Sequence, residues 1–308
     1  MGTILSQFIM DNMEEDDEDF DLSEDALVSM WVKDRDLIKP TTDITLLKQI
    51  PSGIYTAEFN RDIGFFCRKL ETNTDELFLF TNSITQNLLQ EINLFWDKKD
   101  VYKTNNLVHK RGILLEGGPG VGKSSIVTLL CQEVINKGGV VFKVTSYKNL
   151  GDYLGFIRTG FRRIQPNTPI ITILEDIDQY GEVETELLDF LDGKTHIEHH
   201  VVIATTNNTE DIPDTFLRPS RLDLKILIDL PNELVRKEYF IFKKVPEEII
   251  KELVEKSEGC SLADLKEIYI CIFLLDYNIE KAISQVTTPR EKKNYLHNSV
   301  NSNNIGLG

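Results

Sequence analysis

A glycine-rich run that ends in a lysine and two serines carries the clearest chemistry in the sequence. It fits the pattern G-x-x-x-x-G-K-[ST] and reads Gly117-Gly118-Pro119-Gly120-Val121-Gly122-Lys123-Ser124, with Ser125 directly after it. Glycines let backbone N–H groups curl around a phosphate, and the N-terminus of a following helix adds partial positive charge. Lys123 would contact the β- and γ-phosphates of a nucleoside triphosphate, and Ser124 would bind Mg²⁺. The run therefore predicts a nucleotide-phosphate site.

Two acidic residues, Glu175 and Asp176, directly follow the apolar run Ile170–Leu174. Acidic side chains at the carboxyl end of a parallel strand lie at the mouth of a nucleotide crevice. One carboxylate would hold Mg²⁺, which makes Ser124 and Glu175 the expected metal ligands, and Asp176 would orient the attacking water. The alternative is that both are ordinary acidic residues at a strand end.

Strand and helix signals alternate between residues 106 and 230. A helix is predicted from Lys123 to Lys137, where Gly138-Gly139 would end it. Continuous apolar strands that alternate with helices indicate a parallel sheet covered on both faces. We expect an α/β nucleotide-binding domain with five parallel strands between helices. The predicted strands are Ile113–Leu115, Val140–Val144, Ile170–Leu174, Val201–Thr205 and Lys225–Leu230.

Residues 231–286 lack strand signals and predict a small helical domain, with helices over Glu233–Lys243, Glu247–Ser257, Leu262–Leu275 and Asn278–Val286. Residues 287–308 form a polar tail. Residues 26–105 read as a small segment leading into the α/β domain. Within it we expect a helix near Ala26–Trp31, a strand that begins near Ile54, and a helix from Ser83 to Trp96.

Charge is distributed unevenly along the 308 residues, whose formal net charge is −16. Ten of the 50 acidic residues lie between Asp11 and Asp25, and residues 1–25 contain no lysine or arginine. This segment is expected to be disordered, either as a solvating tail or as a docking or autoinhibitory segment. The other 40 acidic residues against 34 lysines and arginines leave −6 on the rest of the chain. That balance argues against broad electrostatic binding to DNA.

The four cysteines are widely spaced and form no C-x-x-C pair, which favours buried thiols of a reducing compartment over disulfides or a zinc site. The longest uncharged apolar run, Ile268–Leu275, is far shorter than the roughly 20 residues that span a bilayer. We therefore expect a cytoplasmic protein without a transmembrane segment.

Taken in order, these motifs resemble an AAA+ ATPase of the AAA clade, which implies a P-loop NTPase fold followed by a helical lid. Ser220 and Leu262 each stand where that family's pattern has a glycine. The matching stretches are Lys110–Leu115, Leu174–Asp178, Leu187–Gly193, Ala204–Asn207, Leu217–Asp223 and Gly259–Leu265.

The resemblance implies roles for four further residues. Asn207 would contact the attacking water or the γ-phosphate, although it could equally be a turn residue at a strand end. Arg218 and Arg221 would reach the ATP of a neighbouring subunit, the alternative being surface salt bridges. Ala263, in the lid signature, would contact the nucleotide. Arginines that act in trans imply a homo-oligomer, expected to be a hexamer, with ATP and Mg²⁺ as ligands.

The order Glu175-Asp176 departs from the usual aspartate-glutamate pair of that family. The same E-D-I-D order occurs in the mitochondrial AAA translocase of the Rieske protein, so the order is compatible with activity. Asp176 is one methylene shorter than glutamate, and a misplacement of about 1 Å can cost around 10²-fold in rate. Asp178 is an alternative carboxylate.

Two smaller patterns leave alternatives open. Tyr153-Leu154-Gly155 resembles the substrate-threading pore loop of AAA translocases, but apolar residues at helical spacing around it equally predict a packed helix. His196, His199 and His200 cluster before a predicted strand. A solvated loop is favoured over a metal site, because no partner ligands have metal-site spacing.

The expected function is ATP hydrolysis in an oligomeric ring that remodels, unfolds or disassembles a macromolecule, with a protein favoured over nucleic acid. Adenine is favoured because the guanine motif N-K-x-D is missing. Alternatives are an AAA+ switch on nucleic acid, such as a clamp or helicase loader, and a weakly hydrolysing nucleotide-binding scaffold. The compact arrangement also resembles stand-alone viral or phage ATPases, for which the compartment would be the host cytoplasm.

Overall fold

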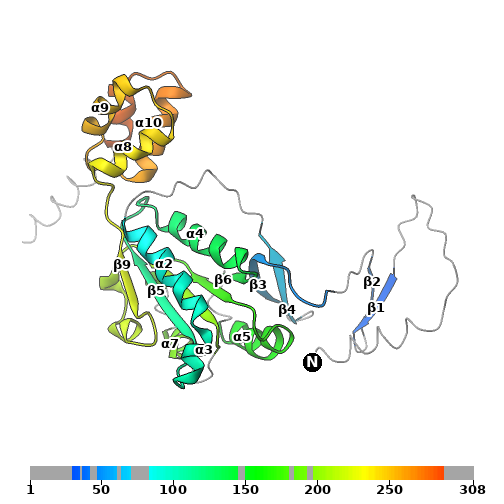
Figure 1. Ribbon diagram of the computed structural model, residues 1–308. Coiled ribbons are helices and arrows are strands. Elements are labelled where there is room, and N and C mark those ends of the chain that lie inside the picture. The colour runs from blue at the N-terminus through cyan, green and yellow to red at the C-terminus, as the bar shows by residue number, and fades with distance from the viewer. Residues whose placement is uncertain are drawn as a thin grey trace, which may run out of the picture.

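A seven-stranded sheet forms the centre of the computed structural model, with its strands in the order β4-β3-β6-β7-β8-β5-β9 (Figure 1). The structure describes residues 30–34, 37–41, 47–60, 64–70, 83–144, 150–179, 184–192 and 197–287. The strands of this sheet are β3 (Gly53–Asn60), β4 (Gly64–Lys69), β5 (Lys110–Glu116), β6 (Val140–Val144), β7 (Ile170–Leu174), β8 (His200–Thr206) and β9 (Leu224–Leu227).

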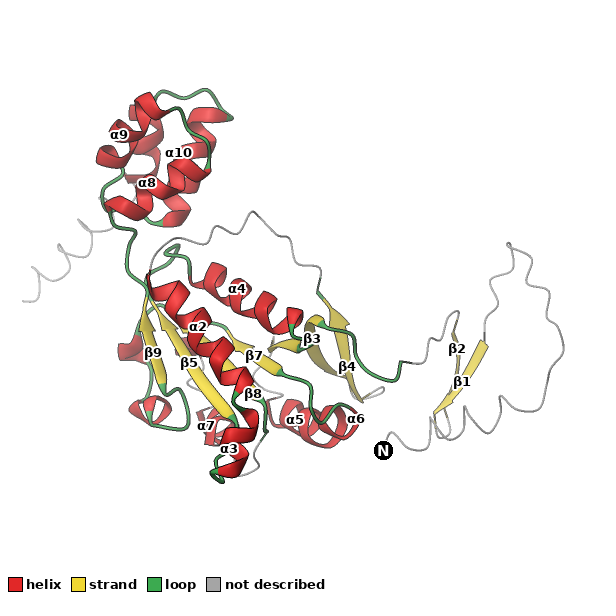
Figure 2. Cartoon of the chain, viewed as in Figure 1, coloured by secondary structure: helices red, strands yellow, loops and turns green. Residues whose placement is uncertain are grey.

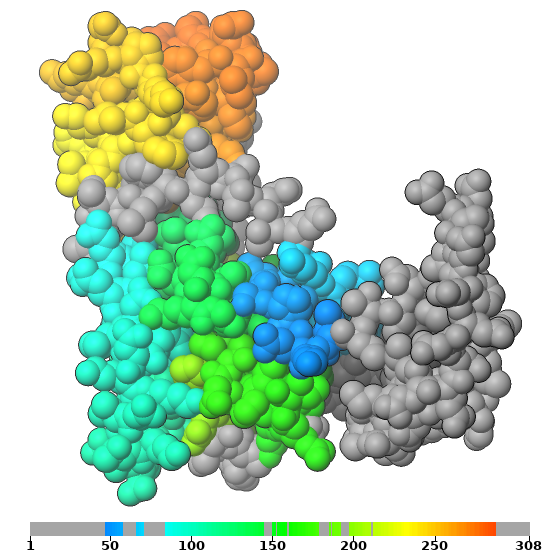
Figure 3. Space-filling view, turned by 45° about the vertical axis from the view of Figure 1, so that its right-hand side comes forward, coloured from blue at the N-terminus to red at the C-terminus, as the bar shows by residue number. Residues whose placement is uncertain are grey.

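Six of these strands run parallel, and only β4 is antiparallel to its neighbour β3. The five predicted strands are present, but the prediction of a five-stranded sheet is wrong in strand number. The predicted strand near Ile54 is β3, and it pairs in parallel with β6, so that β3 and β4 extend the sheet at one edge. Figure 3 shows residues 47–60, in blue, directly against the green part of the chain.

Helices cover both faces of the sheet, as the continuous apolar strands predict (Figure 2). Every residue of β7 and β8 is buried. On one face, β5 and β7 side chains pack with α2 (Ser83–Asp97) and α4 (Lys123–Asn136). On the other face, they pack with α5 (Leu150–Gly155) and α7 (Glu184–Asp192). The short helix α3 (Lys99–Thr104) follows α2.

The C-terminal helices form a separate apolar cluster beyond β9 (Figure 1). They are α8 (Glu233–Phe242), α9 (Glu247–Lys256), α10 (Leu262–Phe273) and a last helix over residues 279–287. All four match the predicted helical ranges to within two residues. None of the helices that the structure describes is both long and apolar enough to cross a bilayer.

A two-stranded ribbon of β1 (Met30–Asp34) and β2 (Leu37–Thr41) precedes the sheet. The predicted helix near Ala26–Trp31 is therefore wrong at Met30 and Trp31, where cross-strand pairing to Pro40 and Thr41 replaces helical packing. Residues 26–29, the acidic segment 1–25 and residues 288–308 of the polar tail lie outside the described residues, so the predictions for them stay predictions.

Tyr153, the candidate pore-loop aromatic, lies in α5 and is only 2% exposed. Its hydroxyl hydrogen-bonds Thr172 Oγ1 of β7 at 2.7 Å. Leu150, Ile157 and Phe161 are buried beside it, the latter two in a π-helical turn, Phe156–Phe161, that leads into α6 (Arg162–Ile164). The packed-helix interpretation is therefore confirmed, and the pore-loop interpretation is wrong for Tyr153.

Candidate nucleotide site

The glycine-rich loop connects the carboxyl end of β5 to the first turn of α4 (Figure 1). Gly120 and Gly122 have φ values of +77° and +109°, which side-chain-bearing residues rarely adopt. Gly122 is the N-cap of α4, so no capping side chain covers the first N–H groups of the helix. Such N–H groups, together with the helix dipole, make a ready anion site.

Lys123 points back over the loop and meets Asn207. Its Nζ donates hydrogen bonds to the carbonyl oxygens of Gly117 at 2.5 Å and Gly118 at 3.0 Å, and to Asn207 Oδ1 at 2.9 Å. Burial lowers the pKa of Lys123, while the nearby carboxylates of Asp176 and Asp178 oppose that shift. The fold thus gathers the cation, Asn207 and two acidic groups at one end of the sheet.

The acidic residues after β7 point in different directions. Glu175 Oε2 forms an ion pair with Lys143 Nζ of β6 at 2.5 Å. Asp176 takes a left-handed backbone conformation, with φ of +49°, and its N–H donates to Thr205 Oγ1 at 3.1 Å. Asp178 Oδ1 accepts a hydrogen bond from Thr206 Oγ1 at 2.9 Å. The carboxylates of Asp176 and Asp178 oppose the lowering of the Lys123 pKa by burial.

Sequence reasoning missed a second polar group beside Asn207, built around Glu116 at the end of β5. Glu116 Oε1 accepts from Thr209 Oγ1 at 2.7 Å, and Glu116 Oε2 pairs with Lys225 Nζ at 3.0 Å. Burial alone would raise the pKa of Glu116, but these donors lower it overall. Asn208 N–H donates to Thr206 Oγ1 at 3.1 Å. These bonds fix the loop after β8, and no motif in the sequence marks them.

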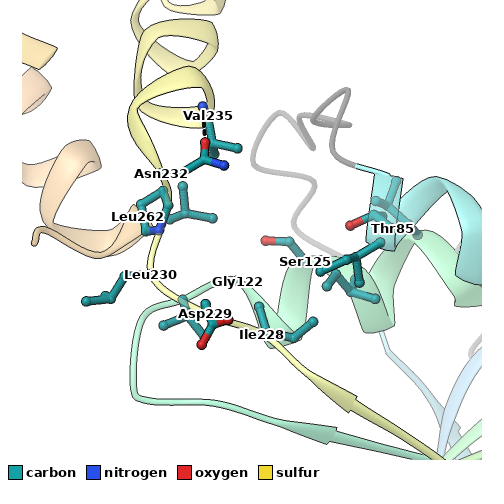
Figure 4. Close-up of a pocket in the computed structure, with 14 residues that line it drawn as sticks. Thr85, Gly122, Ser125, Ile228, Asp229, Leu230, Asn232, Val235 and Leu262 are labelled. Atoms are coloured by element: carbon teal, nitrogen blue, oxygen red, sulfur yellow. Dashed lines mark hydrogen bonds between the residues drawn. The ribbon is translucent and has the colours of Figure 1, made fainter.

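A cavity of about 290 Å³ lies beside the loop, between α2, α4 and the C-terminal helices (Figure 4). Figure 4 shows Thr85 and Ser125 on one side and Leu262, Asn232 and Val235 on the other. Most of its walls are apolar, as in most small-molecule sites. Apart from Val121, Gly122 and Ser125, none of its lining residues is among the predicted site residues. The others are Ile84, Thr85, Ile126, Leu129, Ile228, Asp229, Leu230, Pro231, Asn232, Val235 and Leu262.

The N-terminus of α10 rests directly on the loop. Ala263 N–H donates to the carbonyl of Gly120 at 3.1 Å, and a Cβ built on Gly122 would lie 2.8 Å from Leu262 Cδ1. Ser261 caps this helix reciprocally with Asp264. Ala263 therefore contacts the loop backbone, while Leu262, which stands in place of a pattern glycine, contributes the side chain that lines the cavity.

Arg218 and Arg221 lie away from this group. Leu224 pairs with Ile113 at the start of β9, so the residues before it lie near the amino-terminal half of β5. Gly112, which contacts the backbone of Arg221, precedes Glu116 by four residues, or about 13 Å of strand. Arg218 is exposed, and Arg221 Nη1 donates to the carbonyl of Thr215. Neither arginine lines the cavity.

The histidines are buried at the opposite end of the strands. His199 and His200 are 7% and 2% exposed, so the solvated-loop prediction is wrong for both. His199 Nδ1 hydrogen-bonds His109 Nδ1 at 3.0 Å, and His200 Nε2 hydrogen-bonds Thr172 Oγ1 at 2.8 Å. His196 lies outside the described residues. Within the described part of the chain, no histidine, cysteine and carboxylate group has the arrangement of a metal site.

Together, the parallel sheet, the glycine-rich loop and the strand-end polar residues define a P-loop NTPase domain of the α/β class. Residues 113–230 match the family described as "ATPase family associated with various cellular activities (AAA)". The chain therefore contains an AAA ATPase domain over these residues.

Several curated proteins are similar to this chain. The chain is 31% identical over 206 residues to a cell division cycle protein 48 homolog of Archaeoglobus fulgidus, covering 59% of this chain and 28% of that protein. It is 25% identical over 264 residues to a 26S proteasome regulatory subunit 4 homolog of Schizosaccharomyces pombe, covering 76% and 58%. It is 28% identical over 226 residues to the ATP-dependent zinc metalloprotease FtsH 1 of Phytoplasma mali, covering 64% and 37%. The chain thus spans less than two thirds of the length of each of these relatives.

Proposed function

We propose that this chain is an ATP-hydrolysing motor that assembles into a ring, expected to be a hexamer, and remodels or unfolds a protein. The observation that supports it most is the convergence of Lys123, Asn207 and the carboxylates of Asp176 and Asp178 beside an uncapped helix N-terminus. Charge stabilisation and positioning of these kinds are what phosphoryl transfer requires.

In this proposal, the β-phosphate binds at the N–H groups around Gly120 and Gly122, and Lys123 exchanges its bonds to Gly117 and Gly118 for phosphate oxygens. The left-handed glycines support this role, because a side chain at either position would meet α10. The base enters the apolar cavity between α4 and α10. Asp176 orients the attacking water, and Asn207 contacts the water or the γ-phosphate.

The oxygen donors of Ser124 and Glu175 suit Mg²⁺, which prefers hard oxygen ligands. Bound Mg²⁺ would neutralise charge on the phosphates. For Glu175 to serve as a ligand, its carboxylate must leave the ion pair with Lys143, because that pair now engages the Oε2 oxygen. Lys143 would then be left beside the phosphates or in solvent.

Similarity to proteins named as 26S proteasome regulatory subunits and a cell division cycle protein 48 homolog supports a macromolecular substrate and a ring. The mildly acidic body supports a protein substrate over nucleic acid. The E-D-I-D order shared with the mitochondrial Rieske-protein translocase supports hydrolytic competence and is not carried over to the substrate.

A weakly hydrolysing scaffold is the second candidate, and the Glu175–Lys143 ion pair favours it. That pair competes with metal binding, and the short Asp176 side chain reaches less far than glutamate. The two candidates differ in turnover number and agree in nucleotide binding.

One experiment compares ATP turnover and fluorescent-ATP binding in Lys123→Ala, Asp176→Asn and the control Lys137→Ala, which alters an exposed lysine at the other end of α4. Lys123→Ala should lose both binding and turnover, while Asp176→Asn should keep binding and lose most turnover. The control should match the parent. Parent-level hydrolysis by Lys123→Ala would contradict the site assignment, and slow turnover by the parent with tight binding would favour the scaffold.

A further inference from the structure

We propose that Asp223 and Arg111 are positioning residues that aim the arginine stretch Arg218–Arg221, with Glu91 of α2 as their anchor. This inference rests on the proposed function, since it concerns arginines proposed to act on a neighbouring subunit's ATP. Arg111 and Asp223 lie within two of the matching stretches, which assign neither of them a role, and Glu91 lies outside all of them.

Asp223 holds two groups of β5 at once. Its Oδ1 accepts a hydrogen bond from the backbone N–H of Gly112 at 2.9 Å, and its Oδ2 accepts from Arg111 Nη1 at 2.8 Å. Arg111 Nη2 donates in turn to Glu91 Oε1 at 2.6 Å. A guanidinium held by two carboxylates at these distances has a defined orientation. The carboxylates of Glu91 and Asp223 raise the pKa of Arg111 despite its burial, so the guanidinium stays charged.

The three residues connect opposite faces of the sheet. Successive residues of β5 point to opposite faces. Ile113, two residues after Arg111, packs in the cluster that includes α2, and Leu114, two after Gly112, packs in the cluster that includes Leu222. Asp223, directly before β9, therefore links Arg111 on the α2 face to the backbone of β5, and it follows Leu222, which packs on the other face.

The arginine stretch touches β5 at Gly112. A Cβ built on Gly112 would lie 1.6 Å from the carbonyl oxygen of Arg221, so only a glycine allows this approach. The stretch itself is a turn, closed by a hydrogen bond from Arg221 N–H to Arg218 O at 3.1 Å. No helix or strand fixes its direction, since it lies between the short 3₁₀ helix that ends at Leu217 and β9. Its direction depends on the contact of Arg221 with Gly112, on the bonds from Arg221 Nη1 to Thr215 O and from Leu222 N–H to Phe216 O, and on Asp223, which ties the chain two residues after Arg221 to β5.

The network is partly exposed, with side-chain exposures of 30% for Arg111, 21% for Asp223 and 41% for Glu91. Ion pairs with this exposure add little to folding stability, typically 0–1 kcal/mol. The network therefore matters for the orientation of the arginine stretch more than for folding stability. A shift of about 1 Å in a reacting group can cost around 10²-fold in rate. Loss of Asp223's charge should slow turnover by roughly 10- to 100-fold while ATP binding is unchanged.

The test is a double-mutant cycle on the full chain, with ATP turnover, KM and fluorescent-ATP binding as readouts. Asp223→Asn should lower kcat and leave KM and nucleotide affinity at parent values. In an Arg221→Ala background, Asp223→Asn should cause no further loss, because it acts through that arginine. Glu91→Gln, which keeps the Gly112 bond, should give a smaller loss that also vanishes in that background. Glu91→Gln replaces Asp223→Asn as the test variant if Asp223→Asn folds poorly.

Asp97→Asn is the matched control, because Asp97 forms a surface ion pair with Lys137 at 3.0 Å, and it should match the parent. An additive loss in the Arg221→Ala background, or parent kcat in Asp223→Asn while Arg221→Ala is slow, would overturn this inference alone. Parent turnover in Arg221→Ala would overturn the trans-arginine role and this inference with it. Lost nucleotide binding in Lys123→Ala leaves both unaffected.

Discussion

Ser220 stores backbone strain beside the two arginines. Its φ is +73°, in the left-handed region, where the resembled pattern has a glycine. A non-glycine residue held in this region costs of order 1 kcal/mol or more. Substitution by glycine would relieve this strain, but the greater conformational freedom of glycine in the unfolded chain offsets part of the gain in stability.

Ser220→Gly should therefore raise the free energy of unfolding by up to about 1 kcal/mol. Urea unfolding followed by circular dichroism measures it. Ser52→Gly, at an exposed position before β3, is the control and should be neutral or destabilising. Equal destabilisation by both changes would show that Ser220 is not strained.

At this scale, the sequence predicted residue types better than side-chain directions. The loop, Lys123 and Asn207 lie together as expected, because motif spacing and strand order bring them to one edge. Nothing in the sequence indicated that Glu175 would pair with Lys143, since that pair depends on the adjacency of β6 and β7. In the sequence, Leu262 was notable only because it replaces a glycine of the family pattern. Its contact with Gly122 could not be predicted, because it depends on where the C-terminal helices lie relative to the loop.

Among the elements, α10 contributes Leu262 to the wall of the cavity beside the glycine-rich loop. Leu262 is half-buried against Gly122, and Ala263 N–H bonds the loop. Burying a leucine side chain in full contributes about 1.5–3 kcal/mol, so a half-buried one contributes about 1 kcal/mol.

Leu262→Gly should release fluorescent ADP roughly fivefold faster, since about 1 kcal/mol of lid contact is lost. Stopped-flow displacement measures the rate. Leu274→Gly, at the exposed C-terminal end of the same helix, is the control and should release ADP at the parent rate. Equal rates in both variants would show that Leu262 does not retain the nucleotide.

His109 and His199, directly before β5 and β8, bond each other in a buried histidine network beside His200, the first residue of β8. Burial lowers the pKa of His199 to about 3, helped by the nearby charges of Lys99 and Arg162 and by His109. Burial also lowers the pKa of His109 and of His200. In the unfolded chain these imidazoles titrate near 6.5. Because the folded pKa values are depressed, the stability they contribute is complete above pH 6.5 and is lost as pH falls toward 3.

Between pH 7 and pH 5, the free energy of unfolding should fall by about 2 kcal/mol from His199 alone, and by more with the other two. Urea unfolding at a series of pH values measures this slope. His199→Gln should flatten it, since one titrating group is removed. A pH-independent stability across this range would contradict the buried, neutral state of the network.

Periodicity predicted most elements because each one buries one face. The predicted helices at Ser83–Trp96 and in residues 231–286 and the strand Val140–Val144 agree with the structure within two residues. The structure of short segments was harder to predict from the sequence. Met30 and Trp31 fit a helical spacing but pair across a ribbon, and the addition of β3 and β4 to the sheet depends on pairing over a long sequence distance, which local patterns do not encode.

For the whole molecule, the arginine stretch and the phosphate loop lie at different levels of β5, about 13 Å of strand apart. This separation supports the proposal that each arginine serves a neighbouring copy. ATP would then be part of an interface, and ligand binding that favours the assembled state stabilises it by mass action.

ATP or a slowly hydrolysed analogue should shift the chain from small species to a ring, measured by light scattering. Lys123→Ala should be inactive alone, and Arg221→Ala should bind ATP but lose most of its turnover. Mixing the two should restore part of the turnover, because each supplies the half-site that the other lacks. An active monomer at every ATP concentration would exclude both the ring and the trans arginines.

The pairing of β3 with β6 has a consequence for synthesis on the ribosome. Gly53 pairs with Val140, so β3 leaves the ribosome 87 residues before its partner strand. At about 5–20 residues per second, that delay is roughly 4–17 s. During this interval the hairpin of β3 and β4 exposes an unpaired strand edge, and such edges template aggregation. Chaperone dependence during translation should therefore concentrate on residues 53–69, well before the nucleotide loop can fold.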